Sequence, residues 1–264
     1  MTASHADGRQ ARLQRFFQHA HRWLGLLLGV QILLWMMSGV VMSWFSIELV
    51  RGQTTSVVDF PQELDARNYA APGGVIAQID GARDVRLKTW LGRPVYIVEG
   101  SAQTAMFSAL SGKRLSPISE ANARTVARRD FAGEGEIATV QLTKNPPPEY
   151  RGATPVWRVN FDDWMQSRLY ISPYTGEVVS RRNRVWRLYD FFWMLHIMDY
   201  EDRTDFNNPL LKAASATGLL FALTGLFMVI VRLKNGRYRV RRARAQQSEQ
   251  TADYIEGGPK LTAE

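Results

Sequence analysis

Apolar residues gather in two long stretches that lie toward the two ends of the chain. The first, residues 23–45, has 23 positions without a single charge. At about 1.5 Å of rise per helical residue, this length covers the roughly 30 Å hydrocarbon core of a bilayer. The second, residues 210–231, carries one charge, Lys212, near an end where its long side chain can reach the interface. The pattern therefore predicts two transmembrane helices.

The polar region between these stretches predicts an exported α+β part with an internal repeat. The β-rich run PVYIV at 94–98 recurs as PVWRV at 155–159, about 61 residues later, and a Ser/Thr-Gly turn follows each run. A helical pattern and a further β-rich piece precede each run. The predicted helices cover 72–79 and 119–129, the second capped by Ser119, and the predicted extra strands cover 85–90 and 137–143. We expect two units, 46–117 and 118–185, each with one helix on a small antiparallel sheet.

Residues 186–200 predict a further helix of a different kind. The segment WRLYDFFWMLHIMDY is too short to span a bilayer, yet aromatic residues occur all round it. Such a composition is typical of an amphipathic helix that lies at the membrane interface. His196 falls within this aromatic segment, directly before the second predicted span.

Charge predicts the orientation in the membrane. The formal net charge of +8 is concentrated in a basic lead-in, residues 1–22, and a basic tail, residues 232–264, which we expect to be largely disordered. Under the positive-inside rule, both termini face the cytoplasm and the near-neutral centre is periplasmic. Topology and anionic lipid explain the positive charge, so we expect no nucleic-acid partner. Without cysteine, the chain has no disulfides and no thiolate-ligated metal.

Three blocks of sequence resemble a known family, the PepSY-associated transmembrane helix proteins. They are HRWLGLLLGVQILLWMMSG at 21–39, the two PV(Y/W)xV repeats, and YDFFWMLHIMDYEDRTDFNNPLL at 189–211. The family includes iron-regulated inner-membrane proteins and di-haem ferric-siderophore reductases. The resemblance implies an inner-membrane location, periplasmic PepSY modules and, in some members, haem b. The reductases usually carry four spans, whereas this pattern predicts two.

His21 and His196 occupy the two histidine positions of that resemblance and are the candidate haem-iron ligands. Gly25 and Gly29 follow His21 on one helix face, where they either let another helix approach closely or leave room for a porphyrin edge. Asp199 lies one turn after His196 and is a candidate hydrogen-bond partner for its imidazole. The two histidines begin opposite membrane ends, roughly 30 Å apart. Ligation of one haem by two histidines would therefore need a homodimer or a larger membrane complex.

Two functions from different classes remain open at this point. One is a haem-binding accessory of ferric-siderophore uptake, possessing or supporting ferric-chelate reductase activity. The other is a non-enzymatic periplasmic module that binds a partner protein, inhibits a peptidase or senses the state of the envelope. No P-loop, zincin or nucleophile-elbow motif occurs, and no catalytic residue is assigned. The expected partners are the lipid bilayer and either a ferric siderophore or a periplasmic protein.

Overall fold

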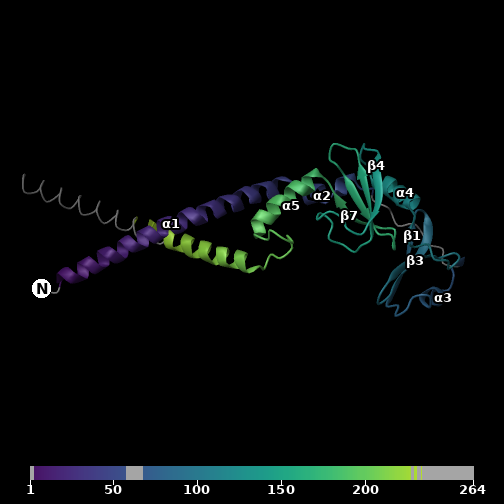
Figure 1. Ribbon diagram of the computed structural model, residues 1–264, viewed down its shortest axis with the longest axis horizontal. Coiled ribbons are helices and arrows are strands. Elements are labelled where there is room, and N and C mark those ends of the chain that lie inside the picture. Colours follow the sequence, from purple (N-terminus) through teal and green to yellow (C-terminus); the bar gives the residue numbers. More distant parts are fainter. Residues whose placement is uncertain (1–2, 58–67, 227–228, 231–232, 234–264) are drawn as a thin grey trace, which may run out of the picture. The chain divides into compact units, whose positions relative to one another are not determined.

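The computed structural model describes residues 3–57, 68–226, 229–230 and 233 (Figure 1). It divides into two compact units. One consists of residues 1–37 and 195–264, and the other of residues 38–194. The prediction of a disordered tail falls almost entirely outside the described residues.

Long helices dominate the first unit. Helix α1 runs without interruption over Ala3–Trp44, so the basic lead-in and the first apolar stretch form one helix. Its segment His21–Trp44 and the helix Pro209–Leu226 are each long and apolar enough to cross a membrane. Both leave large apolar side chains exposed, including Leu27 and Leu219, which suits contact with lipid rather than water. The two predicted apolar helices are therefore present, although the last residues of the second lie outside the described part.

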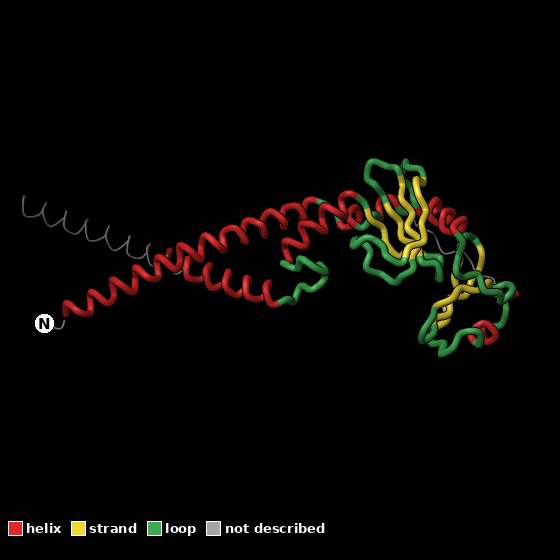
Figure 2. Tube along the Cα trace, viewed as in Figure 1, coloured by secondary structure: helices red, strands yellow, loops and turns green. Residues whose placement is uncertain are grey.

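The second unit contains the predicted α+β region (Figure 2). Its first half comprises α2 (Ile47–Val50), η1 (Gln53–Thr55), α3 (Pro72–Ile76), β1 (Asp84–Trp90), β2 (Arg93–Glu99) and β3 (Thr104–Ser108). Its second half comprises α4 (Glu120–Asp130), β4 (Ile137–Thr143), β5 (Val156–Phe161), β6 (Arg168–Ile171) and β7 (Val178–Arg182), and α5 (Arg184–Ile197) follows. Both sheets are antiparallel, with orders β1-β2-β3 and β4-β5-β6-β7.

Local signals account for many of these boundaries. The hydroxyl of Ser119 accepts a hydrogen bond from the backbone N–H of Asn122 and caps α4, as predicted. Helix α3 ends at Ile76, three residues earlier than predicted, and two of its five residues are glycine, which disfavours a longer helix. The predicted interfacial helix corresponds to α5, which begins at Arg184 and ends at Ile197.

The three-stranded sheet is buried on both of its faces. Val95 and Ile97 of β2 belong to a core cluster that also contains Val126 of α4 and Leu169 of β6. The alternate residue Val98 packs with α3 in a second cluster. Strand β2 therefore reads as a continuous apolar run, the pattern expected of a strand covered on both sides. The two halves of the α+β region share a core, and a unit boundary near residue 117 stays a prediction.

Candidate functional site

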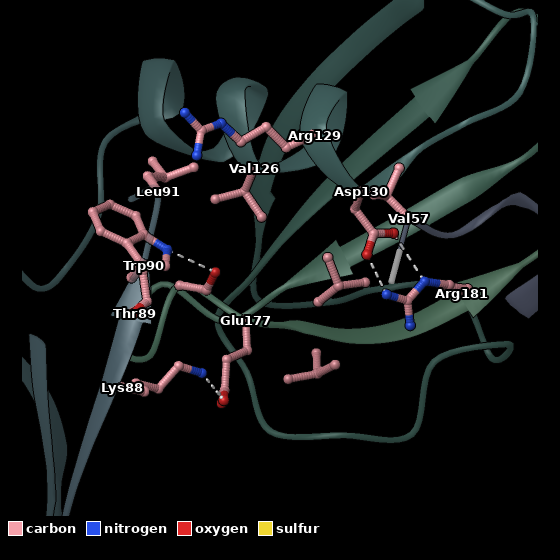
Figure 3. Close-up of a pocket in the computed structure, with 13 residues that line it drawn as sticks. Val57, Lys88, Thr89, Trp90, Leu91, Val126, Arg129, Asp130, Glu177 and Arg181 are labelled. Atoms are coloured by element: carbon pink, nitrogen blue, oxygen red, sulfur yellow. Dashed lines mark hydrogen bonds and ion pairs between the residues drawn. The ribbon is translucent and has the colours of Figure 1, made fainter. Parts of the chain in front are cut away.

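A pocket of about 620 Å³ lies between β1, the end of α4 and β7 (Figure 3). The apolar part of its lining includes Trp90, Leu91 and Val126. Strand β1 is at the edge of the three-stranded sheet, and β7 is at the edge of the four-stranded sheet. Edge strands are the positions at which an extended peptide can add to a sheet.

The turn that closes β6 onto β7 holds the two halves together at this pocket. Gly176 has a φ of +66°, a conformation that glycine adopts without strain. Its carbonyl oxygen accepts a hydrogen bond of 3.0 Å from the indole N–H of Trp90. A Cβ at position 176 would overlap that indole ring. A glycine is therefore needed here both for the turn and for the close approach of β1.

Two ion pairs line the pocket and compensate most of its charge. Lys88 of β1 pairs with Glu177, and Arg181 of β7 donates two hydrogen bonds to the carboxylate of Asp130 (Figure 3). Burial alone would raise the pKa of Glu177, but the contact with Lys88 outweighs it and lowers that pKa. Arg129 also lines the pocket, and no carboxylate among the described residues pairs with it. The pocket thus combines an apolar wall with one uncompensated guanidinium group.

Residues 117–182 match the family model for PepSY, described as the peptidase propeptide and YPEB domain. The match covers the second half of the α+β region. No curated protein and no solved structure matches the chain. The PepSY match includes α4 and the whole four-stranded sheet, and it supplies every pocket residue named above except Lys88, Trp90 and Leu91. It indicates an exported binding or regulatory module. The wider resemblance to iron-regulated membrane proteins stays a prediction.

His21 lies against the second apolar helix. Its imidazole stacks on the ring of Phe221, with centroids 4.3 Å apart and planes 16° apart. A Cβ at Gly25 would lie 3.1 Å from the same phenylalanine ring, whereas Gly29 has nothing within 4 Å. Phe221 is thus the flat group that covers the start of this face. The contact at Gly25 fits the helix-packing interpretation, and the assignment of His21 as a haem ligand stays a prediction.

His196 lies in the last turn of α5. Its carbonyl oxygen accepts a hydrogen bond of 2.9 Å from the indole N–H of Trp35. Trp35 is fourteen residues along α1 from His21, which is about 21 Å of helix axis. The backbone of His196 therefore lies beside α1 far from His21, and the separation of roughly 30 Å between the two imidazoles stays a prediction. A separation of this order prevents both imidazoles of one chain from ligating the same haem iron.

Asp199 organises the loop between α5 and the second apolar helix. Its carboxylate accepts hydrogen bonds from the backbone N–H groups of Glu201, Asp202, Thr204 and Asp205. These bonds, that of Asp205 foremost, lower the pKa of Asp199. A hydrogen bond from the imidazole N–H of His196 to the carboxylate of Asp199 stays a prediction.

The pocket residues were not among those predicted from the sequence. Trp90 and Gly176 are separated by 86 positions, and no local periodicity relates them. The repeated Ser/Thr-Gly turn was the signal available, since it marks Gly176 as a special position. It does not reveal that the indole of Trp90, which belongs to the other half, lies on that turn.

Proposed function

We propose that the protein is a membrane-anchored, periplasmic binding module that captures an extended segment of a partner protein. The observation that carries this proposal is the coincidence of the PepSY match with the pocket between β1, α4 and β7. The family description refers to peptidase propeptides, which favours a peptidase as the partner. Binding would then regulate the activity of that peptidase.

The chemistry of the pocket indicates the kind of segment that fits. An extended peptide can pair with the edge of β1 or β7 through its main chain. An apolar side chain of that peptide would pack on Trp90 and Leu91. A carboxylate on the peptide would meet the guanidinium of Arg129. The proposed ligand is therefore an extended segment with an apolar residue and a nearby acidic group.

Site-specific photo-crosslinking in intact cells tests this proposal. A photoreactive amino acid at Leu91, inside the pocket, is expected to trap a specific partner protein, and the charge reversal Arg129→Glu is expected to abolish the product. The matched control is the same amino acid at Leu110, which is 57% exposed and does not line the pocket. Equal products from both positions, or a product that is unaffected by Arg129→Glu, would contradict capture in this pocket.

We propose the inner membrane as the location, with both termini in the cytoplasm. Support comes from the two apolar helices and from the basic residues that flank them. A reporter enzyme that is active only outside the cytoplasm, fused at Ser101, should be active. Fusions before residue 20 should be inactive with the same reporter.

Haem binding is a second proposal, favoured by the face of α1 that begins at His21. The imidazole is held in place by Phe221, and Gly29 leaves open space further along the helix. His21 would supply one axial ligand, and His21 of a second copy would supply the other. Bound haem would transfer electrons, and ferric-siderophore reduction is the activity that the sequence resemblance implies.

The absorption spectrum of protein purified from haem-replete cells tests this second proposal. A Soret band that is lost in His21→Ala is expected, and its behaviour in His196→Ala tests the other candidate ligand. The matched control is His19→Ala, because His19 accepts a hydrogen bond from Trp23 and does not contact Phe221. A preparation without a Soret band would refute haem binding but would leave partner capture unaffected.

A further inference from the structure

A second, smaller pocket of about 270 Å³ lies on the four-stranded sheet. Arg151 and Arg182 line it together with the hydroxyl-bearing residues Ser172 and Ser180. Helix α4 packs with Ile171 on one face of this sheet, and Tyr170 belongs to a separate cluster. Because successive strand residues point to opposite faces, Tyr170 and the small pocket lie on the face opposite α4.

An irregularity in β7 directs side chains into this pocket. Ile171 pairs with Val178, but Tyr170 pairs with Ser180, so Val179 is an extra residue on β7. Residues directly opposite each other in a sheet share a face, which puts Ser180 on the face of Tyr170. Without the bulge, Ser180 would share the core-facing side of Val178. Bulges of this kind often re-aim side chains next to functional sites.

The serine hydroxyls in the pocket have unused hydrogen-bonding capacity. The Oγ of Ser180 is buried and has no hydrogen-bond partner among the described residues. The Oγ of Ser172 accepts hydrogen bonds from the backbone N–H groups of Tyr174 and Thr175, which leaves its own proton available for donation. A buried hydroxyl without a partner is unfavourable, so a bound acceptor group would satisfy it.

Guanidinium groups outnumber carboxylates around the same pocket. The buried carboxylate of Glu149 accepts hydrogen bonds from Arg187 at 2.8 Å and from Arg168 at 3.0 Å. Asp190 pairs with Arg151 at 3.7 Å. Arg182 donates to the backbone oxygen of Glu149 at 2.7 Å rather than to its carboxylate.

Four guanidinium groups and two carboxylates therefore lie in this pocket or in the ion pairs beside it, a surplus of two positive charges. Burial lowers the pKa of Arg182, the nearby Glu149, Tyr170 and Asp190 counteract this, and the positive charge of Arg151 lowers the pKa again. Two like charges lie close together at the pocket. An anion bound between them would relieve this repulsion.

We propose that this pocket binds a phosphate group, with Arg151 and Arg182 as its cationic ligands and Ser172 and Ser180 as hydroxyl donors. The surplus of two charges matches a dianionic phosphate better than a monoanionic carboxylate. Guanidinium groups bind phosphate oxygens through paired hydrogen bonds. The phosphate group belongs either to a free small molecule or to an anionic lipid headgroup. This site is separate from the proposed capture of a partner protein.

Titration of full-length protein in phosphatidylcholine nanodiscs tests the site. Inorganic phosphate is added at constant ionic strength, and binding is measured by calorimetry. Ser180→Ala is expected to weaken phosphate binding about fivefold, and Arg151→Gln at least about tenfold. Removal of an unpartnered hydroxyl should not destabilise the unliganded protein, so the Ser180→Ala result is independent of folding. Arg93→Gln, an exposed arginine outside the pocket, is the control for loss of charge.

Nanodiscs that contain phosphatidic acid distinguish the two sources of phosphate. If the ligand is a lipid headgroup, inorganic phosphate will not bind. Phosphatidic acid will then raise the thermal midpoint of the native protein, but it will not raise the midpoint of Ser180→Ala or Arg151→Gln. Equal responses to acetate and phosphate, or responses that neither variant changes, would overturn the proposal. Arg129→Glu should leave phosphate binding unchanged, so failure of partner capture and failure of this site are distinguishable.

Discussion

The two sheets of the α+β region contain a repeated sequence motif but have different structural roles. The second sheet has a capped helix of eleven residues, α4, and the second half as a whole provides most of the residues of both pockets. The first sheet has only the five-residue α3, which begins with proline and two glycines. In place of a substantial helix of its own, it buries one face against the second half.

This difference shows that two halves with a repeated sequence motif need not be independent units. The PepSY match covers the second half alone, at residues 117–182. The first half forms one wall of the shared core and, through β1, of the larger pocket. The charged network around Glu149 also belongs to the second half and to α5. Substitutions at equivalent positions of the two halves should therefore change the stability of the protein by unequal amounts.

The largest expected effect comes from removal of a side chain in the shared core. Ile97 is 1% exposed, and Ile97→Ala should lower the free energy of unfolding by about 2–5 kcal/mol. Hydrogen exchange of the full-length protein should show that β2 and β5 lose protection together. Loss of protection confined to β1–β3 would mean that the two sheets are stable independently. Leu110→Ala, at an exposed position, serves as the control.

The two glycine turns provide a matched pair for the next comparison. Gly112 and Gly176 both have a φ of +66°, but only a Cβ at Gly176 would overlap Trp90. We expect Gly176→Ala to cost about 2–4 kcal/mol and Gly112→Ala to cost about 1 kcal/mol. Urea denaturation followed by tryptophan fluorescence measures both. Equal costs would show that the contact between Trp90 and the turn contributes little.

The charged network should make the second half sensitive to acid. Burial alone would raise the pKa of Glu149, but hydrogen bonds from Arg187, Tyr170 and Arg168 outweigh it and lower that pKa below its ordinary value of 4.5. The resulting stabilisation is complete above that value and is lost as the pH falls through the lowered pKa.

Glu149→Gln should cost about 2–3 kcal/mol at pH 7, because it leaves two guanidinium groups without their carboxylate and they are only partly exposed. The variant should also show a weaker loss of stability below pH 4.5 than the native protein. The control is Glu136→Gln, whose side chain is 69% exposed and pairs with Arg128. An unchanged acid limb in Glu149→Gln would contradict the role of this network.

The smallest expected effects on stability come from substitutions in the helices α3 and α4. Ser119→Ala removes the cap of α4 and should cost about 1 kcal/mol. Gly74→Ala in α3 should stabilise the protein by up to about 1 kcal/mol, because an added Cβ meets nothing within 4 Å. Thermal unfolding of both variants in the same detergent gives the comparison. A stabilising Ser119→Ala or a destabilising Gly74→Ala would contradict these assignments.

Much of the local structure followed from sequence patterns that act over a few residues. Absence of charge over 23 positions predicted the apolar part of α1, and the serine before an amphipathic run predicted the start of α4. Strand β4 has the predicted bounds, 137–143. Strands β3, β6 and β7 were expected only as members of small sheets, since they are short and are defined by pairing with neighbours.

The sites depended on contacts between residues that are far apart in the chain. Phe221 covers His21, and Trp90 donates to the turn at Gly176, although local periodicity indicates neither pair. The bulge at Val179 reverses the face of Ser180, which alternation alone would have assigned to the core. Sequence by itself determined where helices and strands form, because propensity, capping and apolar periodicity act locally. Only the tertiary structure decided which side chains meet, because packing and strand register are set by the whole fold.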